Sequence, residues 1–135
     1  MINVDIIPIL EDNYAYLITA PCGTTAILDP GHADQVIEYL QSKGVSPDYI
    51  LNTHHHWDHV NGNPKIKSHY NAQIAAPICS RELIKGSVDI ALHDGDIFKL
   101  GAEEAHIIST PGHTMDGICF YFKESHILFT GDTLF

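Results

Sequence analysis

The sequence predicts an α/β fold that forms half of a layered sandwich of sheets and helices. Short β-branched and aromatic segments, which are typical of strands, recur along its 135 residues. Segments with helical features, at residues 33–43 and 64–70, interrupt these strands. Series of short strands joined by turns stand towards both ends of the chain, as in antiparallel meanders. Strands broken by helices in this order favour a layered α/β architecture.

Length and composition indicate one globular domain. Hydrophobic residues make up 44% of the chain, which is ample for a core. The formal net charge is -10, and the 7 basic residues are scattered, so we expect no nucleic-acid partner. No run approaches the roughly 20 apolar residues of a membrane span, and the start of the chain does not resemble a secretory signal. We therefore expect a cytoplasmic protein without a membrane partner.

The cysteines do not suggest a disulfide framework. Cys22, Cys79 and Cys119 are far apart in the sequence and form no Cys-x-x-Cys pair. An odd, dispersed set fits buried free thiols in a reducing compartment.

The first third of the chain predicts three strands and a helix. Residues 2–9, 14–19 and 24–28 have strand composition and are separated by short polar turns, so they predict an antiparallel meander. Residues 33–43 place Val36, Ile37 and Leu40 on one helical face, and Gly44 follows as a helix stop.

The remainder of the chain alternates between strands and short helices. An apolar run before Asn52 predicts a buried strand. Residues 64–70 and 80–85 are predicted as short helices, and residues 73–78 as a strand between them. Asp94-Gly95-Asp96 is predicted as a hairpin turn, and it is followed by predicted strands at 97–100, 104–109, 117–122 and 126–130.

Four histidines and an aspartate lie in six consecutive positions directly after the buried strand, from His54 to His59. In an extended chain, His54 and His56 share one face and His55 points to the other. A tight turn after Trp57 would bring Asp58 and His59 back towards the same point, so the residues offer two pairs of ligands. Imidazole and carboxylate groups suit zinc, and imidazole also suits iron. The alternative is a polar surface loop that binds metal only adventitiously.

Asp29 follows a predicted strand, where an aspartate is ordinarily a turn residue. Two further residues, later in the chain, follow predicted strands and offer the same kinds of ligand. They are His113 in the sequence Thr-Pro-Gly-His-Thr and Asp132 in the sequence Thr-Gly-Asp-Thr. Each has an alternative role as an ordinary turn residue. Loops at strand ends often gather functional groups on one rim, which favours a shared site. The histidines His32, His69, His93, His106 and His126 lack such a context, and we interpret them as surface or core residues.

The spacing His-x-His-x-Asp-His resembles the metal-binding signature of the metallo-β-lactamase superfamily. The longer string from Thr53 to His59, with Asn61-Gly62-Asn63 after it, resembles the glyoxalase II family (hydroxyacylglutathione hydrolases), as does the segment 7–14. This resemblance implies the amino-terminal half of an αβ/βα sandwich. It implies that residues 1–135 are a metallo-β-lactamase-like domain truncated after Asp132, without the carboxy-terminal helical domain and one further histidine ligand of the family.

The resemblance also implies a set of metal ligands. His54, His56 and His113 would bind one ion, Asp58 and His59 a second, and Asp132 would bridge both. Asp58 and Asp132 would be the catalytic carboxylates, and Asp29 would orient a histidine ligand without binding the metal. The implied cofactors are two divalent ions, zinc first, with iron or manganese as alternatives. The segment Met115-Asp116-Gly117 departs from the usual family pattern, which has Gly-His there.

The implied reaction is hydrolysis of an S-(2-hydroxyacyl)glutathione such as S-lactoylglutathione, as in methylglyoxal detoxification. The expected partner is therefore a small-molecule glutathione thioester. One alternative is a persulfide dioxygenase or another hydrolase of the same fold, and a second is an inactive, truncated metal-binding fragment. The oligomeric state does not follow from the sequence.

Overall fold

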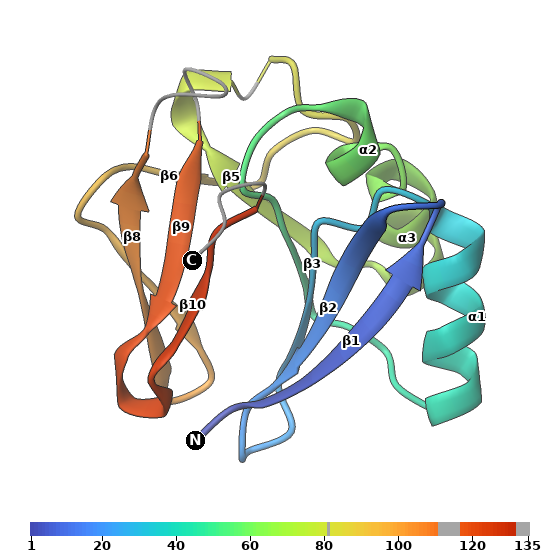
Figure 1. Cartoon of the computed structure of the whole chain (residues 1–135), viewed down its shortest axis with the longest axis horizontal. Helices are drawn as coiled ribbons and strands as arrows, with labels where there is room; N and C mark the ends of the chain where they lie inside the picture. The colour runs from blue at the N-terminus through green and yellow to red at the C-terminus, as the bar shows by residue number, and fades with distance from the viewer. Residues whose placement is uncertain (81, 111–116, 132–135) are drawn as a thin grey trace.

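The computed structural model describes residues 1–80, 82–110 and 117–131 (Figure 1). The elements in chain order are β1 (Asn3–Ile9), β2 (Asn13–Thr19), β3 (Thr25–Leu28), α1 (Ala33–Lys43), β4 (Tyr49–Leu51), α2 (Trp57–Val60), α3 (Asn63–Tyr70), β5 (Gln73–Pro77), the 3-10 turn η1 (Ile78–Ser80), β6 (Ile90–Leu92), β7 (Ile97–Leu100), β8 (Glu103–Ser109), β9 (Ile118–Phe122), the 3-10 turn η2 (Lys123–Ser125) and β10 (Ile127–Phe129).

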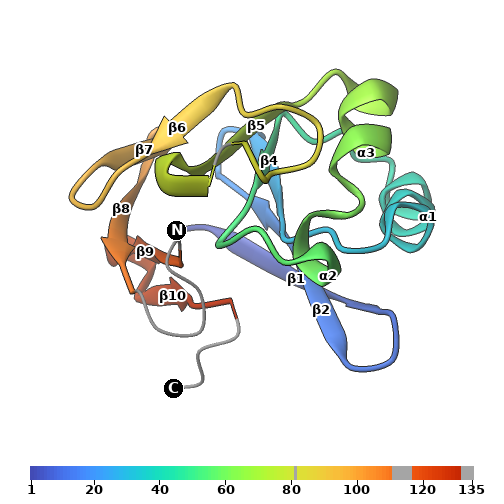
Figure 2. The same cartoon turned by 90° about the horizontal axis from the view of Figure 1, so that it is seen from above.

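The strands of the described residues form two sheets that face each other. The first has the order β1-β2-β3-β4-β5-β6, and the second has the order β10-β9-β8-β7. Strands β1 to β3 are antiparallel, as predicted, whereas β3 to β6 are mutually parallel. Helices α1 and α3 cover the face of the first sheet that points away from the second (Figures 1 and 2). The layered half-sandwich predicted from the sequence is confirmed.

Two hydrophobic cores hold these layers together. The core between the sheets contains Phe98, Phe120 and Phe122 from the second sheet, packed against Leu28 and other residues of the first. The core under the helices is built from residues such as Ile27 and Leu40. Strand β3 contributes to both cores, because all four of its residues are buried and alternate between its two faces. The first sheet is therefore the central layer.

Helix α1 connects two parallel strands and has well-defined ends. Its N-cap is His32, whose Nδ1 accepts a hydrogen bond from the Gln35 backbone N–H at 3.2 Å. Gly44 ends it in the left-handed conformation, with φ 66°. The helix carries the chain from the end of β3 back to the start of β4, so both strands end at the same edge of the sheet. Among the described helices, none is long and apolar enough to cross a membrane.

The structure corrects three predictions and adds one strand. The turn at Asp94-Gly95 does not join a hairpin, because β6 belongs to the first sheet and β7 to the second. In the range 80–85, predicted as a helix, the described residues from 82 onward form turns and a bend, in which buried Ile84 packs into the core under the helices; Gly86 follows with φ 91°. Strand β6 was not predicted. Cys22 and Cys79 are exposed, and only Cys119 is a buried free thiol.

The core between the sheets generates a stability prediction. Phe120 is fully buried, so Phe120→Ala should lower the free energy of unfolding by about 3–5 kcal/mol. Leu128 lies on the outer face of the same sheet and is 39% exposed, so Leu128→Ala should cost much less. Urea unfolding followed by circular dichroism measures both values. Equal losses would contradict the assignment of Phe120 to the principal core.

Candidate metal centre

The histidine run lies at the carboxyl end of β4, as predicted. Leu51 ends the strand, and the chain then runs through residues 52–62 before α3 begins. Asp29 follows the neighbouring parallel strand β3, and its backbone N–H donates to the Leu51 carbonyl at 2.8 Å. The carboxyl ends of adjacent parallel strands meet at one edge of the sheet, where binding sites of α/β proteins commonly form. The two motifs are therefore brought together by β-strand pairing.

Asp29 is the centre of a buried hydrogen-bond network. Its Oδ1 accepts from the Thr53 backbone N–H at 2.9 Å, and its Oδ2 accepts from the Thr53 hydroxyl at 2.7 Å. Oδ2 also lies 3.0 Å from His59 Nδ1. The exposed fractions of Asp29, His54 and His59 are only 2%, 3% and 5%. Hydrogen bonds are strong in such a desolvated setting, so they fix these side chains closely.

This network also sets the tautomers of two histidines. A carboxylate accepts hydrogen bonds and does not donate them, so the Thr53 hydroxyl and His59 Nδ1 must both donate to Asp29. The Thr53 hydroxyl oxygen then accepts from His54 Nδ1, which lies 2.9 Å away. In neutral imidazoles, protons on both Nδ1 atoms leave Nε2 as the unprotonated nitrogen. Asp29 therefore leaves Nε2 unprotonated in His59 directly and in His54 through Thr53, and this is the tautomer that a metal ion bound at Nε2 requires.

The other residues of the run gather around these two rings. The His54 ring centroid lies 4.9 Å from that of His56 and 4.3 Å from that of His59. The single turn of α2 swings the chain around after Trp57, so that Asp58 Oδ2 comes within 3.6 Å of His59 Nε2. The tight turn expected after Trp57 is thus a short helix.

Asp58 is held by a residue from the amino-terminal hairpin. Asn13 Nδ2 donates to Asp58 Oδ2 at 2.9 Å and to the Asp58 carbonyl oxygen at 3.1 Å. Burial opposes ionisation of Asp58, but the hydrogen bond from Asn13 and, in the protonated form of His59, the attraction of its imidazolium outweigh it, so the pKa of Asp58 lies below its ordinary value. Asp58 is therefore poised as an anionic ligand at neutral pH.

A close backbone contact positions α2 over the end of β3. A Cβ atom added at Gly31 would lie 1.8 Å from the Asp58 carbonyl oxygen, so only glycine fits there. This contact places the backbone of Asp58 directly against the segment that follows Asp29.

The described donor atoms fit a divalent metal. Asp29, His54 and His59 each offer one ligand atom, and these atoms all lie within 4.8 Å of one another. Imidazole nitrogens and carboxylate oxygens are the donors that zinc and iron accept. Because both Asp29 oxygens already accept hydrogen bonds, we interpret Asp29 as an orienting carboxylate, which is the role that the family resemblance implies.

His113 and Asp132 lie outside the described residues, so their predicted roles stay predictions. The residues that flank them do reach the site. The Ile118 N–H donates to the Thr53 carbonyl at 2.9 Å, and the Thr110 N–H donates to Gly117 at 2.8 Å. A Cβ atom added at Gly131 would lie 2.6 Å from Thr53 Oγ1. Ile118, which follows His113 in the sequence, and Gly131, which precedes Asp132, therefore both lie against Thr53.

The sequence did not assign roles to Thr53 and Asn13. Both lie within the family-like segments, but their partners could not be named without the fold. Asn13 and Asp58 are 45 residues apart. The available signal for Thr53 was a polar residue between a buried strand and the histidine run.

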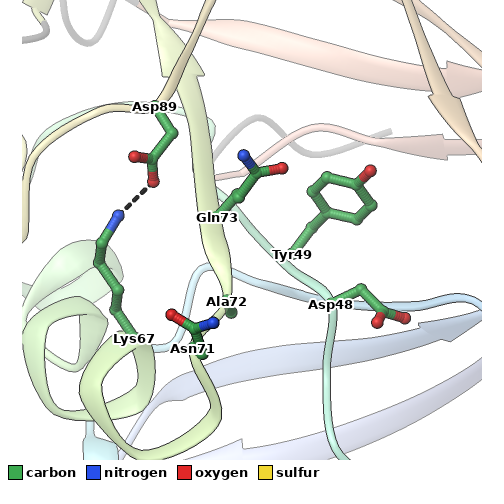
Figure 3. A pocket seen from close by; sticks show the side chains of 7 residues that line it. All are labelled: Asp48, Tyr49, Lys67, Asn71, Ala72, Gln73 and Asp89. Carbon is green, nitrogen blue, oxygen red and sulfur yellow. Dashed lines mark hydrogen bonds and ion pairs between the residues drawn. The ribbon is translucent and has the colours of Figure 1, made fainter.

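A pocket of about 570 Å³ lies at the end of β4 and β5 that is opposite the histidine run (Figure 3). Asp48 and Gln73 line it at the starts of these strands, and Lys67 pairs with Asp89 at its rim. None of the predicted metal ligands lines this pocket. We therefore place the candidate site at the carboxyl ends of the strands, where the histidines converge.

Comparison with known proteins yields a family match over nearly the whole chain. A family model described as the metallo-beta-lactamase superfamily matches residues 9–135. A hydroxyacylglutathione hydrolase from Methylococcus capsulatus is 43% identical over 136 residues, covering 100% of this chain and 53% of the relative. One from Pelagibacter ubique is 43% identical over 134 residues, covering 98% of this chain and 56% of the relative. The chain thus spans about half the length of these curated relatives.

Solved structures share the fold at low sequence identity. The BLEG-1 B3 metallo-beta-lactamase has a TM-score of 0.89 at 22% identity, and it covers 98% of this chain and 73% of its own. TTHA1623, in a di-iron-bound form, has a TM-score of 0.80 at 23% identity, with the same two coverages. Likeness at these identities supports the fold alone.

The bond from Asn13 generates a prediction for metal binding. Asn13→Ala removes both hydrogen bonds that Asn13 donates to Asp58. The affinity for the metal ion that Asp58 is predicted to bind should therefore fall about 10–100-fold. Competition with a chromophoric chelator measures this affinity. The exposed Asn3→Ala variant serves as the control. Unchanged affinity in Asn13→Ala would show that Asp58 is held by other contacts.

His55 is predicted not to be a ligand, since it was expected to point away from His54 and His56. Its ring packs edge-on against that of His56, with centroids 5.4 Å apart. His55→Ala should therefore retain bound metal, which elemental analysis of the folded protein would measure. Loss of metal without loss of folded protein would make His55 a ligand.

Proposed function

The chain belongs to the metallo-beta-lactamase superfamily, and from this premise we propose that it forms the metal-binding half of a glutathione thioester hydrolase. The observation that carries this proposal is the Asp29 network, which presents two imidazole Nε2 atoms beside Asp58. The names of the curated relatives support the choice of reaction, since they are hydroxyacylglutathione hydrolases at 37–43% identity. The proposed substrate is an S-(2-hydroxyacyl)glutathione such as S-lactoylglutathione, the thioester of methylglyoxal detoxification.

We propose two divalent metal ions as cofactors, zinc first, with iron or manganese as alternatives. His54, His56 and His113 would hold one ion, Asp58 and His59 the other, and Asp132 both. The described donors support this assignment, because the buried rings of His54 and His59 lie with their centroids 4.3 Å apart and Asp58 Oδ2 lies 3.6 Å from His59 Nε2. When bound, such ions lower the pKa of water and polarise a carbonyl group, which are the two requirements of thioester hydrolysis.

The residues of the chain would contribute orientation and charge to this reaction. Asp29 keeps His54 and His59 in the ligand tautomer, so the geometry is set before metal or substrate binds. Asp58, with its lowered pKa, supplies a negative charge that partly offsets the charge of the ions. Asp132 is proposed as the second catalytic carboxylate.

Trp57 and Asn13 extend the proposed site towards solvent. Together with Glu11 and Asp12 they line a pocket of about 370 Å³ that borders Asp58. Trp57 is 64% exposed, so its ring is available for contact with a bound molecule. Asp58 itself lines this pocket, which supports access of a small-molecule substrate to the proposed site.

We predict that His56→Ala or Asp132→Ala in the protein that carries this chain lowers thioesterase activity by about 10²-fold or more, since each removes a proposed ligand. Loss of thioester absorbance gives the activity, and elemental analysis gives the metal content. His69→Ala, at an exposed position on α3, is the matched control. Treatment with a chelator should abolish activity, and added zinc, iron or manganese should restore it. Full turnover in the metal-free protein would contradict the proposal.

A further inference from the structure

We propose that a buried pair of amides, Asn52 and Asn63, is a clasp that closes the metal-binding loop and positions His59. The two residues stand directly before and after the segment 53–62, which contains the whole histidine run. Both are fully buried, with exposed fractions of 0%. The proposal rests on the proposed function, because it takes this segment as the metal-binding loop.

The two side chains bind each other through both of their amide groups. Asn63 Nδ2 donates to Asn52 Oδ1 at 2.6 Å, and Asn52 Nδ2 faces Asn63 Oδ1 at 3.3 Å. This reciprocal pair spans the neck of the loop. A loop whose ends are fixed has less conformational freedom along its whole length. Its side chains therefore lose less conformational entropy when a ligand binds.

The pair is also tied to the loop interior and to a third segment. Asn52 Nδ2 lies 3.5 Å from the His59 carbonyl oxygen, at the outer limit of a hydrogen bond, and 3.3 Å from that of Leu51. Asn63 Nδ2 donates its second hydrogen to the Lys85 carbonyl at 3.1 Å. The clasp therefore connects the end of β4, the carbonyl of His59 and the turn at residues 82–86.

The packing around the clasp leaves little room for an alternative arrangement. A Cβ atom added at Gly86 would lie 3.4 Å from Asn63 Cβ and 2.9 Å from the Ile74 side chain. Asn63 has both amide hydrogens bonded, so the burial of this polar pair is compensated. A satisfied polar network in a low-dielectric interior specifies one geometry, whereas an apolar pair would leave the loop ends free to slide.

Asn63 is therefore assigned as a positioning residue that acts through the loop on His59. Asn63→Asp preserves the size of the side chain but replaces the donating amide by a carboxylate that faces Asn52 Oδ1 and the Lys85 carbonyl. Repulsion between these oxygens should open the clasp. Asn61→Asp is the matched control, because it adds the same charge two positions away at an exposed site in the same loop.

The first measurement uses the metal-free protein. The N–H groups of His59, Val60 and Asn61 are hydrogen-bonded to the carbonyls of His56 and Trp57, so they report on the order of the loop. Hydrogen–deuterium exchange of the peptide covering residues 57–62 should become about tenfold or more faster in Asn63→Asp and stay near the parent rate in Asn61→Asp. Equal rates in the two variants would overturn the clasp, whether or not the parent binds metal.

The second measurement is zinc affinity by chelator competition. Asn63→Asp should lower it about 10–100-fold, with Asn61→Asp close to the parent. Phe98→Leu, in the core between the sheets, gives a destabilised protein with an intact clasp. If Phe98→Leu loses as much affinity as Asn63→Asp at an equal loss of stability, the effect is one of stability and the positioning role is wrong. A parent that binds no zinc, iron or manganese would overturn the proposed function, and the exchange measurement would then decide the clasp alone.

Discussion

The candidate site depends on the hydrogen bonds of a single buried carboxylate. Asp29 fixes the backbone of Thr53 through one oxygen, and through the other it orients the Thr53 hydroxyl and the His59 ring. A desolvated carboxylate is costly unless it is fully hydrogen-bonded, and here three donors meet it. Because Asp29 needs these hydrogen bonds, the Thr53 hydroxyl and the His59 ring take the orientation that also suits metal binding.

The parallel part of the first sheet supplies the geometry that this network needs. Strands β3 and β4 are in register and end at the same edge, so Asp29 and Thr53 emerge side by side. Helix α1 provides the return path between them, with His32 at its beginning and Gly44 at its end. The second sheet then brings Ile118 to the Thr53 carbonyl. Residues of the candidate site that are far apart in sequence are thus positioned by regular backbone pairing.

Much of this arrangement could be predicted from the sequence, because the signals were local. The apolar run before Asn52 marks β4, and the density of histidines after it marks the site. The Asp-Gly turn at residues 94–95 was misassigned as a hairpin, since a turn signal does not reveal that its two strands belong to different sheets. The partner of Asn13 could not be predicted, because it depends on how the first hairpin packs against α2. Strand β6, with three residues, is too short to show a periodic pattern.

The sequence separations within the site have a consequence for the order of assembly. The bonds from Asp29 to Thr53 and His59 close loops of 24 and 30 residues, and the bond from Asn13 to Asp58 closes one of 45. Non-local contacts of this kind form after the entropy of loop closure has been overcome, so they mature late in folding. In a newly made chain, the side chains of the histidine run would therefore stay without a fixed orientation until the hydrogen bonds of Asp29 and Asn13 have formed. Any metal ion that these side chains hold would reach its final coordination geometry only after these contacts have formed.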